Sequence, residues 1–166
     1  MTTTPTASLP TPATDDQARP VARLLNMRLR RAPDPAVEAA WERFCAFARV
    51  LDQGTRALVA TVPSARRPGA PVEAGVAGFQ AGTEAARAEL PAWALPELAK
   101  EQAAVLAALD AADRRAQELP AATAGMDFEH RNQAVGEVLD ELAPVQDAEA
   151  ALRHLRRRRR REDDHA

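Results

Sequence analysis

Prolines divide this chain into segments of helical length, and this division constrains the fold more than any other feature. Beyond the first thirty residues or so, the prolines are Pro33, Pro35, Pro63, Pro68, Pro71, Pro91, Pro96, Pro120 and Pro144. Because proline interrupts helices and strand pairing alike, regular elements must lie largely between these positions. Within each interval the apolar residues recur at steps of three and four, which is the spacing of one face of an α-helix.

The first interval shows this pattern best. Asp34 is suited to cap a helix, and Pro35 is suited to its first position. Residues that are apolar or small then form a heptad seam of alternating steps of four and three: Val37, Trp41, Phe44, Ala48, Leu51, Thr55, Leu58 and Val62. Such a seam is typical of coiled-coil-like packing. The sequence therefore predicts a helix from about 35 to 62, with Trp41 in the core and Gly54 weakening the middle.

Three further stripes follow, at 72–90, 95–119 and 128–142, and a kink or break at Pro144 precedes a last stretch to Leu155. Gly75, Gly78 and Gly82 lie beside the second stripe. They indicate either a poorly formed helix or the close approach of another helix. Gln102 and Asn132 fall on the third and fourth stripes, where polar residues can fix the register of a bundle.

Composition selects the helical alternative for all of these segments. The chain has 39 alanines but no isoleucine or tyrosine. Alanine has the highest helix propensity, whereas strands favour β-branched and aromatic residues. Four one-sided stripes with short connections predict an all-α, antiparallel four-helix bundle.

The two ends differ from this central region. Residues 1–20 are rich in Thr, Pro and Ala without periodicity, so we expect a disordered tail. Residues 21–33 form a short basic amphipathic segment, which would add a short N-terminal helix. The bundle domain is expected at 34–155. Residues 156–166 form an Arg-rich charged tail, into which the last helix is expected to fray.

No catalytic, cofactor-binding or metal-ligating constellation is recognisable. His130 follows Asp127 by three residues, whereas a di-metal bundle needs two Glu-x-x-His pairs and further carboxylates. We expect His130 to be exposed or capped near a helix start. Cys45 is expected to pack as a small apolar residue; catalysis would require a nearby cation, and an intermolecular crosslink is a further alternative.

Candidate partner-binding residues are one tryptophan and the C-terminal arginines. Trp93 lies in a proline-bounded turn, where it either caps the end of the bundle or anchors a partner. The other candidates are Arg153, Arg156, Arg157, Arg158, Arg159, Arg160 and Arg161, which place seven positive charges within nine residues. Such a run can bind the phosphates of nucleic acid or anionic lipid. It can also stabilise a helix end, or pair with acids of the fourth segment or of residues 162–164.

These observations favour a non-enzymatic helical interaction protein, such as a small adaptor, an assembly factor or a structural subunit, with a protein partner or self-association. The first alternative is a protein that binds nucleic acid through the basic tail without sequence specificity. The second is an enzyme or carrier with a ligand near the glycine stripe. No apolar run is long enough for a transmembrane helix, and no signal peptide is recognisable, so the cytoplasm is the expected compartment. The excess of Arg over Lys suggests a GC-rich, bacterial genome.

Overall fold

The computed structural model describes residues 34–164. The segments 1–20 and 21–33, with their expected disorder and basic helix, lie outside these residues, as do 165–166. The described part contains α2 (Pro35–Val59), α3 (Val72–Glu89), α4 (Ala99–Ala122), α5 (Phe128–Asp140) and α6 (Ala143–Asp164). Two short 3-10 helices, η1 (Leu90–Trp93) and η2 (Pro96–Leu98), connect α3 to α4. No strand occurs between residues 34 and 164, so the prediction of an all-α fold is confirmed.

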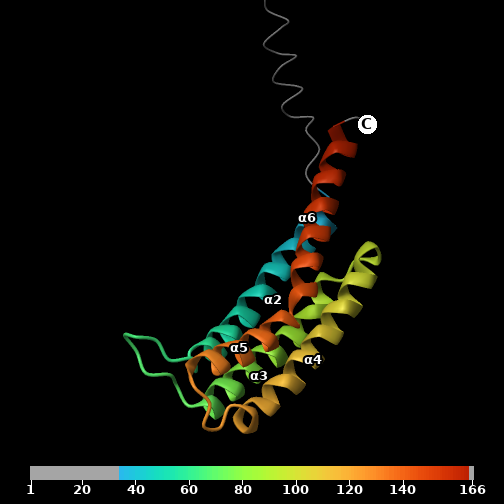
Figure 1. Cartoon of the computed structure of the whole chain (residues 1–166). Coiled ribbons are helices and arrows are strands. Elements are labelled where there is room, and N and C mark those ends of the chain that lie inside the picture. Colours follow the sequence, from blue (N-terminus) through green and yellow to red (C-terminus); the bar gives the residue numbers. More distant parts are fainter. Residues whose placement is uncertain (1–33, 165–166) are drawn as a thin grey trace, which may run out of the picture.

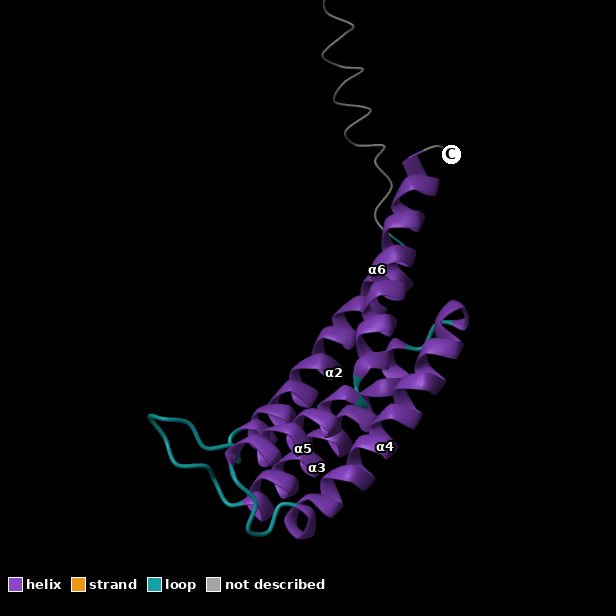
Figure 2. Cartoon of the chain, in the orientation of Figure 1, coloured by secondary structure: helices purple, strands orange, loops and turns teal. Residues whose placement is uncertain are grey.

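The helices form an antiparallel bundle of four arms (Figures 1 and 2). α2 runs toward the end that carries the α2–α3 loop, α3 returns, and α4 runs down again. α5 and α6 then return together as one broken arm. α2 contacts α3 and α6, and α4 contacts α3, α5 and α6, so the four arms close into a ring. The predicted four-helix bundle is therefore confirmed.

Capping residues and prolines set the helix ends. The Asp34 carboxylate accepts a hydrogen bond from the backbone N–H of Ala36 at 3.0 Å, and Pro35 is the first residue of α2, as predicted. The break in the fourth arm lies at residues 141–142, just before the expected position. Pro144 is consequently the second residue of α6, where its missing N–H costs no helical hydrogen bond.

The core lies on a face of α2 that is wider than the predicted seam. Val37, Phe44, Leu51 and Leu58 are buried as expected. They alternate with a second buried set: Ala40, Phe47 and Gly54. The predicted alternates Trp41, Ala48 and Thr55 are only half-buried. Trp41 and Ala48 still pack against the core, but the most deeply buried positions are shifted because α2 packs against α3 on one side and the α5–α6 arm on the other.

α2 and α3 approach closely through their glycines. An ideal Cβ placed on Gly82 would lie 2.6 Å from Cα of Gly54, and one placed on Gly54 would lie 3.0 Å from Cα of Gly82. A Cβ on Gly78 would lie 2.7 Å from that of Ala57. Of the two interpretations of the glycine stripe, close approach is correct. Because α2 covers the stripe, this face offers no room for a ligand.

α3 and α4 are joined by a polar cluster at their interface. The hydroxyl of Thr83, which is fully buried, donates to the Asp113 carboxylate at 2.7 Å. Arg87 forms ion pairs with Asp110, at 3.0 Å, and with Asp113. These contacts satisfy polar groups that the bundle would otherwise bury without partners.

The two polar residues on the predicted seams have other positions. Asn132 is exposed, and Phe128 on the same stripe is 50% exposed, so the first turns of α5 lie outside the core and the prediction for Asn132 was wrong. Gln102 is half-buried, and its side-chain amide donates to the carbonyl of Leu90 at 3.0 Å. It therefore attaches α4 to η1.

Candidate functional site

The arginine run belongs to a helix. α6 continues to Asp164, so the expected fraying from Arg156 does not occur. Helical periodicity divides the run into residues that face the bundle and residues that face outward. Cations also stabilise the C-terminal end of a helix through its dipole, and the ion pairs of the bundle-facing arginines add to this effect.

Glu38 of α2 is the centre of the bundle-facing contacts. Arg156 donates to both of its carboxylate oxygens, with Nε 2.8 Å from Oε1 and Nη2 2.6 Å from Oε2. Arg160 donates to Oε1 at 2.8 Å. Such a two-pronged arrangement is the stronger form of ion pair. The arginines of α6 thus hold its C-terminal end against the start of α2.

A second acid and an aromatic ring complete this bundle-facing side. Arg159 donates to Glu97 of η2 at 2.9 Å and lies 3.8 Å from the Asp34 carboxylate. The guanidinium groups of Arg153 and Arg156 lie 5.6 and 5.2 Å from the centre of the Trp41 ring, within the range of cation–π interactions. Trp41 therefore lies at the edge of the core, where the side chains of Arg153 and Arg156 cover its ring.

These partners are mainly not the acids that the sequence suggested. Glu38 and Glu97 lie in the first turns of α2 and η2, far from α6 in the chain. The acidic fourth segment contributes one pairing, between Arg153 and Glu149 at 2.6 Å, and it lies within α6 itself. The antiparallel packing of α2 and α6 brings the basic end of one helix to the acidic start of the other.

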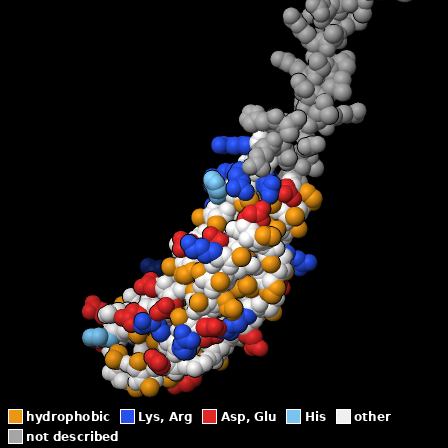
Figure 3. Space-filling model, turned by 90° about the vertical axis from the view of Figure 1, so that its right-hand side faces the viewer, with side chains coloured by type: hydrophobic (Ala, Val, Ile, Leu, Met, Phe, Trp, Pro, Cys, Tyr) orange, Lys and Arg blue, Asp and Glu red, His pale blue; other side chains and the backbone are white. Residues whose placement is uncertain are grey.

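The outward face of α6 carries His154, Arg157, Arg158 and Arg161, all of which are exposed. These four side chains surround a hollow of about 270 Å³. Arg and His side chains gather at this end of the molecule (Figure 3). Arg158 also acts on Glu97: the pKa of Glu97 is lowered by its backbone hydrogen bond, then by the hydrogen bond from Arg159, and lastly by the charges of Arg159 and Arg158.

Trp93 is a core residue. It is fully buried, and its ring packs edge-on against Phe44 and Phe47 of α2, with centroid distances of 5.2 and 5.6 Å. A side chain with no exposed surface cannot contact a partner, so the expectation of a partner anchor is corrected. Because η1 closes one end of the α2–α3 pair, Trp93 has the capping position that the sequence left as its alternative.

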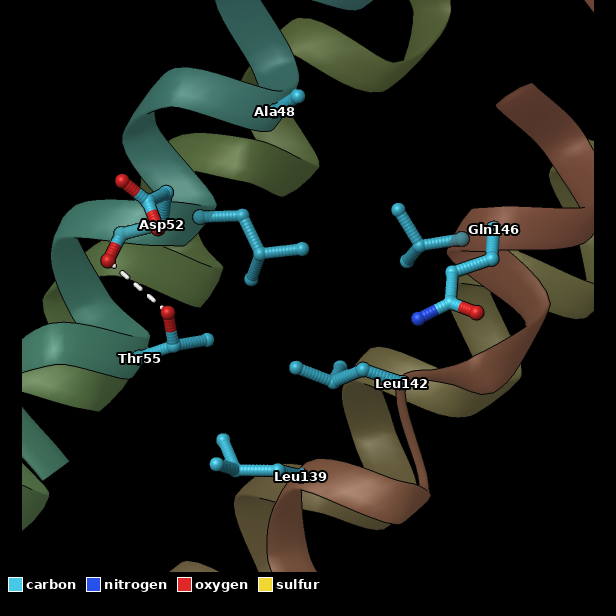
Figure 4. Close-up of a pocket in the computed structure, with 8 residues that line it drawn as sticks. Ala48, Asp52, Thr55, Leu139, Leu142 and Gln146 are labelled. Atoms are coloured by element: carbon cyan, nitrogen blue, oxygen red, sulfur yellow. Dashed lines mark hydrogen bonds between the residues drawn. The ribbon is translucent and has the colours of Figure 1, made fainter. Parts of the chain in front are cut away.

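An apolar groove separates α2 from the α5–α6 arm. Its volume is about 350 Å³. It is lined by Ala48, Leu51, Asp52 and Thr55 of α2 and by Leu139, Leu142, Val145 and Gln146 across the gap. Figure 4 shows Leu139 and Leu142 pointing across the opening toward the side that carries Thr55. The residues that line this groove include two predicted seam positions of α2, Ala48 and Thr55, but no feature of the sequence indicates that a gap lies beside them.

The polar groups on the α2 side of the groove already have partners. The hydroxyl of Thr55 donates to the backbone carbonyl of Asp52 at 2.9 Å, and the Asp52 carboxylate pairs with Arg56 at 2.7 Å. The α2 side of the groove is therefore suited to contact apolar side chains, because the hydrogen-bonding groups of Thr55 and Asp52 are bonded within α2.

The remaining candidate residues are dispersed. His130 is exposed and lies 2.7 Å from the Asp127 carboxylate, which also caps α5. Cys45 is half-buried. Among the side chains that the structure describes, those of residues 34–161, no group of three His, Cys, Asp or Glu is placed to hold a metal ion. No helix in the described part of the chain combines the length and apolarity needed to cross a membrane.

Glu38→Gln is expected to destabilise the protein by about 1 kcal/mol at neutral pH. The pKa of Glu38 is lowered from its ordinary value of 4.5, chiefly because Arg156 donates to its carboxylate. A lowered pKa contributes stability above 4.5 that disappears as the pH falls through the folded-state value. Urea unfolding between pH 7 and pH 3 should show the deficit of the variant shrinking toward zero.

The control is Glu42→Gln, one turn further along α2. Glu42 is exposed and forms no ion pair with any residue that the structure describes. The Glu42→Gln substitution should therefore change the free energy of unfolding little at any pH. An equal loss in both variants, or a Glu38→Gln deficit that persists at pH 3, would contradict a stabilising role for the ion pairs to Glu38.

No protein-family model, curated protein or solved structure matches this chain significantly.

Proposed function

We propose that this chain is a non-enzymatic helical interaction protein, acting as an adaptor, assembly factor or structural subunit, and that its groove binds one α-helix of a protein partner. The observation that carries this proposal is the apolar gap between α2 and the α5–α6 arm. Its lining includes Leu51, Leu139, Leu142 and Val145. Apolar surface of this kind is stabilised when a complementary apolar surface covers it.

The shape of the groove favours a helix as the occupant. On α2 the half-buried positions Ala48 and Thr55 lie seven residues apart, with Leu51 between them, and follow one side of the groove. Across the gap, Leu139, Leu142 and Val145 recur every three. A helix that lies between two other helices presents side chains at the same spacings, so that its ridges fit their grooves. The expected partner is an amphipathic helix with apolar residues three and four apart.

Size and polarity argue against a small-molecule site. The volume of about 350 Å³ is near the lower limit of ligand pockets, which span roughly 300–1,000 Å³. Such pockets normally hold a few polar groups aimed at the ligand. Here Thr55 and Asp52 bond to their own helix. The groove therefore suits a few apolar side chains of a protein better than a substrate.

A photo-crosslinking experiment tests this proposal. A photoreactive residue replaces Gln146, at the rim of the groove, in the tagged full-length chain expressed in its native cells. We expect a crosslinked protein that persists after nuclease treatment and whose crosslinked peptide is an amphipathic helix. A crosslink to another copy of this chain would identify the partner as self. No crosslink above the level given by the same residue at exposed Ala81 would refute the proposal.

Charged substitutions provide the matched control. Ala48→Glu places a carboxylate in the groove, whereas Ala39→Glu places one on the exposed side of the same helix. Ala48→Glu should reduce recovery of the crosslinked partner at least about tenfold, since burying one unpaired charge costs several kcal/mol. Ala39→Glu should leave it unchanged. Circular dichroism confirms that both variants are folded.

A further inference from the structure

We propose that residues 21–31 of this chain dock as a helix in the groove between α2 and the α5–α6 arm, and occupy it until a partner helix displaces them. These residues lie outside the part of the chain that the structure describes, which begins at Asp34. The inference rests on the proposed function in that both concern the same groove. It adds a regulation of that groove, because a partner must compete with the chain's own segment.

The first argument is the sequence of the segment. Its apolar residues recur at helical spacing, so a helix would carry them along one side: Val21, Leu24, Leu25 and Leu29. Arg23 and Arg30 would lie on the opposite side. An amphipathic helix of this kind docks by laying its apolar side in a groove. The groove offers an apolar lining that includes Leu51, Leu139, Leu142 and Val145.

The second argument is the reach of the connection. The groove begins at Ala48, about 21 Å along α2 from Asp34, and extends about 10 Å further to Thr55. The chain from Leu29 to Asp34 spans at most about 17 Å when extended, and a helix from Leu29 back to Val21 adds about 12 Å. The segment therefore reaches past Ala48 and nearly to Thr55 when it runs antiparallel to α2.

The residues beside the connection suit an extended conformation. Pro33 and Pro35 each disfavour a helical conformation of the residue before them. Asp34, which precedes Pro35, has a ψ angle of 113° and so does not continue α2 backward. A helix over residues 21–31 and α2 are thus expected to be separate helices, which allows the chain to reverse its direction between them.

The third argument is charge complementarity. Residues 21–31 carry four arginines and no acid. The arm that forms one wall of the groove is acidic, since residues 126–149 carry seven acids against one arginine. Two of these acids, Asp140 and Asp147, are exposed and form no ion pair with any side chain that the structure describes. Opposite charges on a segment and its docking surface favour their encounter and select against other occupants.

The covalent connection favours the chain's own segment over a free helix. A short linker gives the docking segment an effective concentration in roughly the millimolar range. Even weak docking then fills much of the groove, and the apparent affinity of a partner falls by the fraction of groove that remains open. A partner helix must therefore share the chemistry of the segment, an apolar side with basic residues beside it, and bind the groove more strongly.

The test uses the purified full-length chain, without any partner, with the photoreactive residue at Gln146. We expect a crosslink within one chain, which peptide mass spectrometry assigns to residues 21–31. The same photoreactive residue at exposed Ala81 should not give this crosslink. A mixture of isotopically light and heavy chains distinguishes a crosslink within one chain from a crosslink between two copies.

Leu25→Glu is the informative variant. It should reduce the internal crosslink at least about tenfold, because an unpaired carboxylate would enter an apolar groove. In the native cells it should raise recovery of the partner at Gln146 severalfold, because the competing segment is removed. Asn26→Glu is the matched control: it adds the same charge away from the apolar side of the helix and should change neither result much.

Three outcomes would overturn the inference: an internal crosslink equally strong from Ala81, a crosslink that joins only different copies, or equal effects of Leu25→Glu and Asn26→Glu. None of them bears on the proposed function, which stands as long as Gln146 captures a partner in cells. Conversely, internal docking without any captured partner would support this inference and refute the proposed function alone.

Discussion

Gly82→Ala is expected to destabilise the protein by about 1–3 kcal/mol, the usual cost of overpacking a tight contact. In an ordinary helix this change stabilises, because alanine has the higher helix propensity by about 1 kcal/mol. Here the new methyl group would lie 2.6 Å from Cα and 2.9 Å from N of Gly54. Both atoms are backbone, so α2 and α3 must move apart. Their separation would disturb the contacts of Val50 and Phe79, which flank the crossing.

Gly136→Ala is the matched control and should have the opposite sign. Gly136 lies inside α5, and a Cβ there would meet no atom within 4 Å. Helix propensity alone should then stabilise the protein by about 0.5–1 kcal/mol. Urea unfolding of both variants beside the parent gives the comparison. Two stabilising substitutions would contradict the close approach of α2 and α3.

Helix boundaries were the most predictable part of the fold. Asp34 and Pro35 mark the start of α2, and the break before Pro144 separates α5 from α6. These features are local, because a cap or a proline acts on the turn in which it stands.

Two helix ends differ from the prediction. α2 ends at Val59 and not near residue 62, and α4 continues past Pro120 to Ala122. A proline near the end of a helix interrupts few later hydrogen bonds, so sequence alone could not place that end.

The register of α2 was less predictable. Positions 41, 48 and 55 and positions 40, 47 and 54 both continue a three-and-four pattern from Val37. Periodicity shows that one side of a helix is apolar, but it does not show how many neighbours cover that side. The contacts with α3 bury the second set, and the gap beside α5 and α6 leaves Ala48 and Thr55 half-covered. The groove is a consequence of packing.

The division of the arginine run also depended on tertiary structure. The sequence shows seven charges and four candidate roles for them. Glu38 and Glu97 lie more than sixty residues before their arginines, and only the packing of α6 beside α2 and η2 brings them together. Helical phase then decides that Arg156 and Arg160 meet the bundle while Arg157 and Arg161 face away.

Trp93→Ala is expected to cost about 3–5 kcal/mol of stability, as large-to-small substitutions of buried aromatic residues do. The change would remove the ring that packs on Phe44 and Phe47 and leave a cavity beneath η1. Trp93→Phe should lose much less, because a ring remains at the site. Urea unfolding followed by circular dichroism measures both.

Trp41→Ala is the comparison that distinguishes a core role of Trp93 from a partner-binding role. Trp41 is half-buried and is covered by Arg153 and Arg156. Its loss should cost about 1–2 kcal/mol, from two cation–π contacts and part of an apolar surface. If Trp93→Ala were no more destabilising than Trp41→Ala, yet abolished crosslinking of the partner at Gln146, Trp93 would be a partner anchor after all. A large loss of stability in Trp93→Ala, with crosslinking retained in a folded Trp93→Phe variant, assigns Trp93 to the core and leaves recognition to the groove.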